Sequence, residues 1–231
     1  MGNNPVNDLK LSPTKTKQNN PIIVSINGVE VRKNDLNKLF QDEKINDSVV
    51  DSILSLKQDQ NPTSLYVDSK IVSKMILYGE KYSNIELDHS EFSEKTYFKR
   101  ILQDEKFTSY EKIYFPFCND DHWILFVYNL IDKKMYNYDS ISEFNENAIQ
   151  SMNSLYYVLT KVCLKDLHIP EYISGKCQLQ TNCIDCGIHV ISNALAPESG
   201  EGDIQFRIGN NYREYLYHSI TNKTLVEYVN E

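Results

Sequence analysis

The sequence predicts a single α+β domain, in which antiparallel strands form a buried sheet and amphipathic helices pack against it. Residues 123–128 are apolar at consecutive positions, which is typical of a central strand covered on both faces. Residues 112–117 and 135–138 are strand-like runs on either side of it, separated from it by polar turns at 118–121 and 132–134. Residues 149–163 carry apolar side chains at steps of three and four, which indicates a helix.

The composition limits the classes of partner. The chain has 231 residues, 41% of them hydrophobic, which is enough for one domain with a full-size core. A formal net charge of −8 argues against nucleic acid as a partner. Five cysteines without framework spacing leave at least one free thiol and favour a reducing compartment. Without an apolar run of membrane-spanning length or a signal-peptide pattern, we expect a cytoplasmic or nuclear monomer that does not bind membranes.

The N-terminal part divides into an arm and the start of the folded domain. Residues 1–20 are mostly polar and bury too little surface to offset the entropy of ordering, so we expect a disordered arm. Residues 21–231 have no internal repeat and no break in composition, and we expect one domain there. Its first element is a predicted hairpin over residues 21–31, because Asn27-Gly28 lies between two β-branched runs.

Helical patterns account for most of the other segments. Asn46 and Asp47 precede apolar side chains at helical spacing, which predicts a capped amphipathic helix. We expect further helices from Ser69 onward, over residues 92–102, and over residues 212–229 with a break near residue 221.

The segment before Pro197 has the pattern of a reactive thiol. Cys186 is followed by a glycine and by an apolar, helix-like run at 188–195, which the proline ends. A thiol on the first turn of a helix faces the positive end of the helix dipole, which favours the thiolate. Gln180 lies shortly before it, close enough for its amide to point back at the thiol.

A base and its partner are found upstream. His122 begins the predicted central strand and Asp139 follows the next strand, so antiparallel pairing brings the two side by side. A carboxylate beside an imidazole fixes its tautomer, and the imidazole can then take the proton of Cys186. The Gln180 amide would donate to the oxyanion that forms when a carbonyl is attacked, typically about 3–4 kcal/mol of barrier.

Each of these residues also has a structural explanation. His122 could be an ordinary strand-end histidine, Asp139-Ser140 could simply form a turn, and Cys186 could be an inert buried thiol. All four residue types in this order, on suitable elements, are much less expected by chance than any one of them.

The motifs resemble the ubiquitin-like-protein-specific proteases, the SUMO-protease group of cysteine peptidases. The resemblance extends over residues 22–220 and rests on His122-Trp123, Tyr138-Asp139-Ser140, Gln180-x-Asn182-x-x-Asp185-Cys186-Gly187-Ile188, Arg32-Lys33-Asn34-Asp35-Leu36 and Asn46-Asp47. It implies a papain-like α+β fold with a rearranged element order, the histidine before the cysteine. It also implies hydrolysis after the C-terminal Gly-Gly of SUMO, a Nedd-type modifier or ubiquitin, with the modifier and its conjugates as partners. We expect no cofactor and no metal.

Carried over by residue, the resemblance makes Cys186 the nucleophile, His122 the base, Asp139 its orienter and Gln180 the oxyanion donor. It further implies substrate contacts. Trp123 would line a narrow channel that admits only glycines, unless it is ordinary core packing. Asp47 would contact the modifier and reach an arginine of its tail, unless it is a helix N-cap. The family usually has tryptophan then leucine where this chain has Lys44-Ile45, so one wall of the channel is expected to differ.

Parts of the sequence also fit other functions. Cys183 and Cys186 form a C-x-x-C pair, but the strand–helix context of a redox dithiol is missing. Cys186 and His189 share a helical face, although two ligands are too few for zinc. A catalytically silent modifier-binding module and a protein acetyltransferase of the same clan are the remaining alternatives. Asn-, Lys- and Ile-rich usage would also suit an AT-rich genome, including that of an intracellular bacterium that delivers an effector into the host cytoplasm.

Overall fold

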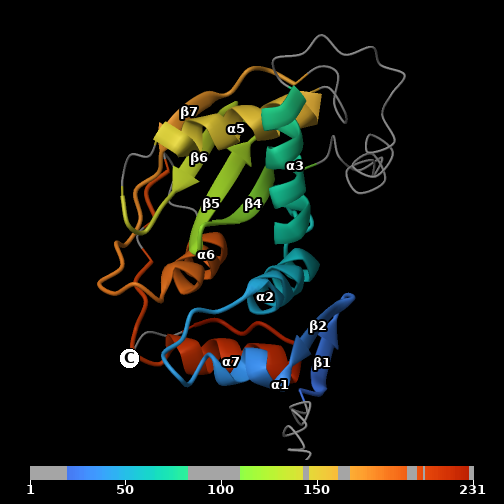
Figure 1. Cartoon of the computed structure of the whole chain (residues 1–231), viewed down its shortest axis with the longest axis vertical. Helices are drawn as coiled ribbons and strands as arrows, with labels where there is room; N and C mark the ends of the chain where they lie inside the picture. The colour runs from blue at the N-terminus through green and yellow to red at the C-terminus, as the bar shows by residue number, and fades with distance from the viewer. Residues whose placement is uncertain are drawn as a thin grey trace, which may run out of the picture.

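A computed structural model describes residues 20–82, 110–142, 146–160, 167–196, 202–204 and 206–228 of the chain. It contains a five-stranded mixed sheet and a separate two-stranded hairpin, with helices packed on both faces of the larger sheet (Figure 1). The predicted α+β class is therefore confirmed. The predicted arm at 1–20, apart from Asn20, and the predicted helix at 92–102 lie outside the described residues.

The larger sheet has the strand order β3-β4-β5-β6-β7. Its strands are β3 (Ser64–Tyr66), β4 (Lys112–Asn119), β5 (His122–Asn129), β6 (Lys134–Tyr138) and β7 (Glu171–Ser174). The three central strands are antiparallel, and the two edge strands add in parallel. The predicted central position of β5 is confirmed, whereas β3 and β7 were not predicted.

The turn between β4 and β5 is tighter than predicted. The turn was predicted over 118–121, which is two residues too long. Strand β4 continues to Asn119, which pairs with His122. Only Asp120 and Asp121 form the turn, with φ of 47° and 65°. Two residues with positive φ match the right-handed twist of a hairpin. This tight turn fixes the position of His122 at the first residue of β5.

The two faces of the sheet pack against different helices. Helices α3 (Ser69–Tyr82) and α5 (Glu146–Val158) cover one face, whereas α2 (Asp47–Gln60) and α6 (Cys186–Leu195) cover the other (Figure 1). Side chains of β5 alternate between two buried clusters: Trp123, Leu125 and Val127 in one, and Ile124, Phe126 and Tyr128 in the other. This double burial explains why the strand is apolar at consecutive positions.

The hairpin and the terminal helices complete the fold below α2 in Figure 1. The predicted hairpin is confirmed as β1 (Ile22–Ile26) and β2 (Val29–Arg32), with φ of 47° and 89° at Asn27 and Gly28. Helix α1 (Lys33–Asn37) follows it, and α7 (Tyr212–Asn222) lies beside it. The last helix was predicted over 212–229 with a break near 221; it ends at Asn222, where Lys223 adopts a left-handed conformation with φ of 54°, and residues 224–228 are not helical, so the predicted second part is wrong.

Two polar contacts fix the beginnings of α2 and α3. The side chain of Asn46 accepts a hydrogen bond from the backbone N–H of Val49, which confirms the predicted cap. The buried carboxylate of Asp51 accepts bonds of 3.0 Å from the backbone N–H and 2.8 Å from the hydroxyl of Ser69. Within the described part of the chain, no helix is long and apolar enough to cross a membrane.

Candidate active site

Helix α6 begins at Cys186, as the sequence predicted. Nearly every residue of the helix is buried, because it lies between the sheet and α2; the buried residues include the polar His189, Ser192 and Asn193. The side chain of Cys186 lies at the N-terminal end of this helix, and the residue is only 2% exposed. The positive end of the helix dipole therefore acts on this thiol and favours the thiolate, whereas its burial opposes the charged form. Figure 1 shows α6 next to the beginning of β5.

His122 and Asp139 lie side by side at one end of the sheet. Antiparallel pairing of β5 with β6 sets Leu125 opposite Tyr138, so the first residue of β5 comes close to the residue that follows β6. His122 Nε2 lies 2.7 Å from Asp139 Oδ1. The same oxygen accepts a bond of 2.9 Å from the backbone N–H of Ile141. Asp139 therefore also stabilises a turn, the structural role that the sequence had left open for it.

The electrostatics link this pair to the thiol. The hydrogen bond with Asp139, followed by that with Cys186, raises the pKa of His122 to about 9. Burial raises the pKa of Cys186. Hydrogen bonds with His122 and with the backbone of Trp123 and Gly187 lower it by more, so the pKa of this thiol is lowered overall. Because Nε2 of His122 bonds Asp139, Nδ1 is the ring nitrogen that can bond the thiol of Cys186. These shifts favour a thiolate–imidazolium pair.

Gln180 is held in the loop before α6. Its side-chain oxygen accepts a bond of 2.6 Å from the Ser140 hydroxyl, and its backbone N–H donates to the Ser140 carbonyl oxygen at 2.8 Å. Its amide nitrogen donates to the carbonyl oxygen of Asn182. An amide nitrogen carries two hydrogens, and this bond uses one. None of the described hydrogen bonds of Gln180 joins its amide to the thiol of Cys186.

Asn182 was named in the sequence motif without a role, and the structure gives it one. Its side-chain oxygen accepts bonds of 3.0 Å from the backbone N–H groups of Ile184 and Asp185. Its amide nitrogen donates to Asp185 Oδ2 at 2.6 Å. Asn182 therefore shapes the turn that delivers the chain to the first residue of α6.

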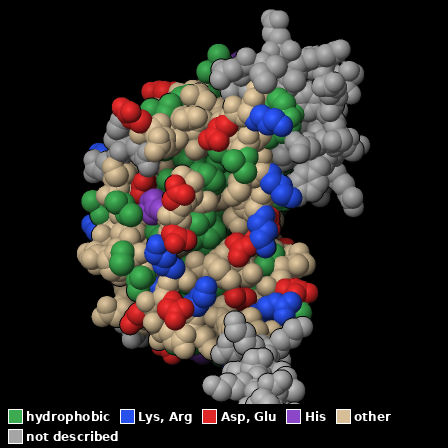
Figure 2. Space-filling view, in the orientation of Figure 1, with side chains coloured by type: hydrophobic (Ala, Val, Ile, Leu, Met, Phe, Trp, Pro, Cys, Tyr) green, Lys and Arg blue, Asp and Glu red, His purple; other side chains and the backbone are tan. Residues whose placement is uncertain are grey.

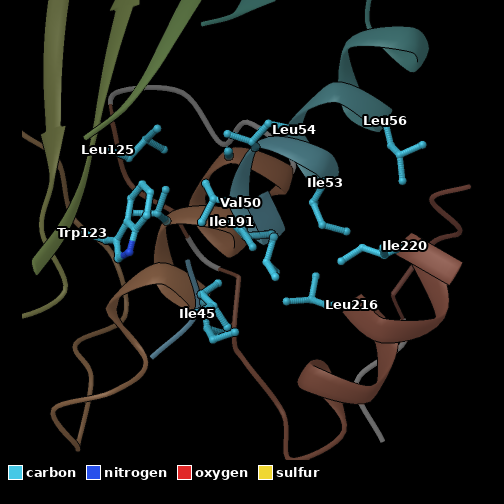
Figure 3. Packing of buried hydrophobic residues seen from close by; sticks show 14 of the residues in the cluster. Ile45, Val50, Ile53, Leu54, Leu56, Trp123, Leu125, Ile191, Leu216 and Ile220 are labelled. Carbon is cyan, nitrogen blue, oxygen red and sulfur yellow. The ribbon is translucent and has the colours of Figure 1, made fainter. Parts of the chain in front are cut away.

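Trp123 lies mainly in the core. The residue is 5% exposed, and Figure 3 shows its ring pointing from β5 toward the helices, with Ile45 and Val50 nearby. A Cβ atom at Gly187 would lie 2.6 Å from Ile45 Cγ1 and 3.2 Å from Trp123 Cδ1, so only glycine allows this close approach. Most of the tryptophan surface is thus used in core packing, the alternative considered above. Its contact with a substrate tail stays a prediction.

Lys44 occupies the position where the resembling family usually has tryptophan. Its ammonium group donates a hydrogen bond of 3.0 Å to the backbone carbonyl oxygen of Asp121. The sulfur of Cys186 lies 3.9 Å from the same oxygen. The lysine side chain therefore bridges the segment before α2 and the β4–β5 turn, directly beside the thiol.

Asp47 is paired with a lysine. Its Oδ2 lies 2.7 Å from Lys70 Nζ, and the two side chains are 32% and 69% exposed. Asp47 is the first residue of α2, whereas the cap is Asn46, so the alternative explanation of Asp47 as the N-cap is wrong. An arginine from a partner would have to compete with Lys70 for this carboxylate.

The cysteine pair and the possible metal ligands near the site bear on the redox and zinc alternatives. Cys183 is exposed and Cys186 is buried, and both are free thiols. The described residues contain no group of three or more His, Cys, Asp and Glu side chains placed to hold a metal. On the face drawn in Figure 2, acidic and basic side chains are interspersed around hydrophobic ones.

Comparison with known proteins decides the family. The family described as "Ulp1 protease family, C-terminal catalytic domain" matches residues 43–196, more than half of the chain. The chain belongs to the Ulp1 protease family. A curated relative, the probable sentrin-specific protease 8 of Dictyostelium discoideum, is 27% identical over 187 residues, which cover 74% of this chain and 73% of the relative. Membership of the Ulp1 family confirms the resemblance noted in the sequence and establishes the chain as a cysteine protease.

Solved structures of Ulp1-type proteases share the fold. The Ulp1 protease domain in complex with Smt3, the yeast ortholog of SUMO, has a TM-score of 0.70 at 20% identity, with 89% of each chain covered. SUMO protease Ulp1 with its catalytic cysteine oxidised to a sulfenic acid has a TM-score of 0.71 at 20% identity, with 87% of this chain and 88% of that chain covered. The Ulp1-like SUMO protease catalytic domain of Chaetomium thermophilum has a TM-score of 0.60 at 19% identity, with 85% and 80% covered.

Proposed function

We propose that this Ulp1-family protease hydrolyses the bond after the C-terminal Gly-Gly of a ubiquitin-like modifier, with SUMO as the first candidate. One observation carries the proposal: His122 contacts Asp139 at 2.7 Å on one side, and its hydrogen bond with Cys186 lowers the pKa of that thiol on the other. The choice of modifier is supported by the Ulp1 domain that is complexed with Smt3. A Nedd-type modifier and ubiquitin are the other substrates to be tested.

In the first half of the reaction, the thiolate of Cys186 attacks the carbonyl carbon of the terminal glycine. The C–N bond then breaks, and the imidazolium of His122 gives its proton to the leaving amine, which leaves a thioester on the sulfur. In the second half, the neutral imidazole takes a proton from water, and the hydroxide attacks the thioester. The modifier leaves with a free carboxylate, and the thiolate–imidazolium pair is restored. Asp139 keeps Nε2 occupied throughout, so that Nδ1 faces the reacting atoms.

The oxyanion formed in each half needs donors beside the thiol. The backbone N–H groups at the start of α6 are oriented by the helix and cost no rearrangement during the reaction. Gln180 is the second donor. One hydrogen of its side-chain amide bonds the carbonyl oxygen of Asn182, and the other hydrogen can bond the oxyanion. Ser140 and Asn182 hold the side-chain amide from both ends, which limits its rotation.

Three side chains near Cys186 bear on the proposed preference for a glycine tail. Ile45 and Trp123 already approach the backbone of Gly187 so closely that a methyl group would clash. Lys44 donates to the carbonyl oxygen of Asp121, which lies 3.9 Å from the sulfur of Cys186. The resemblance to the SUMO proteases supports a tail without side chains, and Trp123 and Lys44 are the side chains proposed to contact it.

The test is hydrolysis of modifiers that carry a fluorogenic amide on the C-terminal glycine: SUMO, a Nedd-type modifier and ubiquitin. The wild-type protein is expected to release the fluorophore from at least one of them, and Cys186→Ala should release none while still binding the modifier. Cys183→Ala is the matched control, because this exposed thiol lies in the same loop and is expected to leave turnover unchanged. Turnover retained in Cys186→Ala would reject the mechanism.

A further inference from the structure

Arg213 of α7 makes an unusual set of contacts for a residue far from the nucleophile in sequence. Its Nε donates to Asp185 Oδ1 at 3.1 Å, and its Nη2 bonds the same oxygen. Its Nη1 donates to the backbone carbonyl oxygens of Lys38 at 3.0 Å and Glu43 at 3.2 Å. The guanidinium thus joins three segments of the chain, and its side chain is only 15% exposed.

Both ends of this arrangement are next to the active site. Asp185 directly precedes Cys186, and its carboxylate does not cap α6 but pairs with Arg213 and Asn182. Glu43 directly precedes Lys44, which contacts the carbonyl oxygen beside the thiol. A single side chain therefore holds the start of the nucleophile helix against the segment that carries Lys44.

Together with the contacts already described, Arg213 closes a ring of hydrogen bonds and chain neighbours around the thiol. Starting from Asp139 and its neighbour Ser140, the ring passes through Gln180, Asn182, Asp185, Arg213, Glu43, Lys44, Asp121 and His122, and returns to Asp139. Arg213 is the link between the loop before α6 and the segment before α2. A lysine cannot replace it fully, because only the planar fork of arginine reaches a carboxylate and two carbonyl groups at once.

We propose that Arg213 is a positioning residue of this active site, which neutralises Asp185 beside the nucleophile and fixes the segment with Lys44 against α6. The second of these roles rests on the proposed function, since it concerns entry of a modifier tail. The first concerns the thiol alone and is independent of the substrate. The two roles are separable, because one depends on charge and the other on the geometry of the fork.

The electrostatic role has a definite sign. The groups around the thiol are His122 from β5, Cys118 from β4, and Lys44 and Asp121 on the facing side. Asp185 directly precedes Cys186 in the chain, and its charge also acts on His189 of α6. Without the guanidinium, the carboxylate of Asp185, the residue directly before Cys186, would be left with its charge uncompensated. A nearby like charge disfavours the ionised thiol, so the pH at which Cys186 becomes reactive should rise.

The experiment compares Arg213→Gln and Arg213→Lys with Arg207→Gln, an exposed arginine that serves as the control. The first measurement is the rate of Cys186 alkylation by iodoacetamide against pH, which needs no modifier. The second is kcat and KM for the modifier that the wild-type protein cleaves. We expect Arg213→Gln to raise the alkylation midpoint by about half a pH unit and to lower kcat/KM at least about tenfold.

Arg213→Lys should separate the two roles. It keeps the positive charge and should leave the alkylation midpoint near that of the wild type, while kcat/KM falls because the bonds to the carbonyl oxygens are lost. Adding Asp185→Asn to Arg213→Gln should bring the midpoint back without restoring kcat/KM. Unfolding curves at the assay temperature establish that each variant is folded.

The outcomes are decisive in both directions. Arg213→Gln with an unchanged midpoint and unchanged kcat/KM would overturn the proposal, as would losses of activity that only follow the fraction of unfolded protein. If the wild-type protein cleaves no modifier, the proposed function fails, but the alkylation midpoints still decide whether Arg213 tunes the thiol.

Discussion

The ammonium group of Lys44 lies 3.0 Å from the backbone carbonyl oxygen of Asp121, and the sulfur of Cys186 lies 3.9 Å from that same oxygen. A flexible, charged side chain therefore stands beside the reacting atom, where the family usually has an aromatic wall. Asp121 is also the residue before His122, so the contact joins the segment before α2 to the start of β5, the strand with the proposed base.

This contact predicts an effect on tail selectivity. Lys44→Ala removes the bridge and should let a tail ending in Ala-Gly react at a rate closer to that of Gly-Gly. Lys44→Trp should place an aromatic side chain there and increase the preference for Gly-Gly by about tenfold, the lower end of the range that one hydrophobic contact typically gives. The measurement is the ratio of kcat/KM for the two tails, with the exposed Lys176→Ala as the control. An identical ratio in all these variants would exclude Lys44 from selectivity.

The pH profile should report the histidine. The protonated imidazole is favoured below its raised pKa of about 9, and the thiolate is favoured above the lowered pKa of Cys186, so the pair exists between these limits. Asp139→Asn removes the largest cause of the raised pKa. The basic limb of kcat/KM should therefore move to lower pH, and turnover should fall about 10⁴-fold. A basic limb that does not move would mean that another group orients His122.

The pairing of Asp47 with Lys70 predicts opposite effects for two substitutions. Asp47→Asn should raise KM for a modifier with an arginine in its tail and leave kcat unchanged, because the carboxylate pairs with Lys70 and not with His122 or Cys186. Lys70→Ala should lower KM for the same modifier, since the competing ammonium group at 2.7 Å is removed. Replacing the modifier's arginine with glutamine should abolish both effects. If KM is the same in both variants and the wild type, Asp47 does not contact the tail.

The buried Asp51 predicts how stability depends on pH. Burial, followed by the charge of Asp68, raises the pKa of Asp51 from 3.8 to about 7. A raised pKa means that the fold favours the protonated carboxyl group. Its contribution is fully present below pH 3.8 and is lost as the pH rises through about 7. Asp51→Asn keeps an oxygen acceptor for the N–H of Ser69 without the charge.

Urea unfolding of both proteins at pH 5 and pH 8 gives the comparison. The free energy of unfolding of Asp51→Asn, relative to the wild type, should be higher at pH 8 than at pH 5. A difference that is the same at both pH values would show that Asp51 does not titrate in this range.

The sequence predicted those parts of the site that lie on regular elements. His122, Asp139 and Cys186 each begin or follow a strand or helix with a clear pattern, so their positions could be inferred from spacing and antiparallel pairing. The edge strands β3 and β7 were missed because three and four residues are too few for an alternating pattern. Arg213 has no local signal, since its contacts with Glu43 join residues 170 positions apart and depend on how α7 packs.

The most direct test of the account is covalent capture by modifiers with a thiol-reactive group in place of the C-terminal carboxylate. SUMO, a Nedd-type modifier and ubiquitin would each be incubated with the wild type, Cys186→Ala and Cys183→Ala. We expect an adduct with at least one modifier, SUMO first, that forms in the wild type and in Cys183→Ala and is absent in Cys186→Ala. An adduct that persists in Cys186→Ala, or no adduct with any of the three while iodoacetamide still alkylates Cys186, would contradict it.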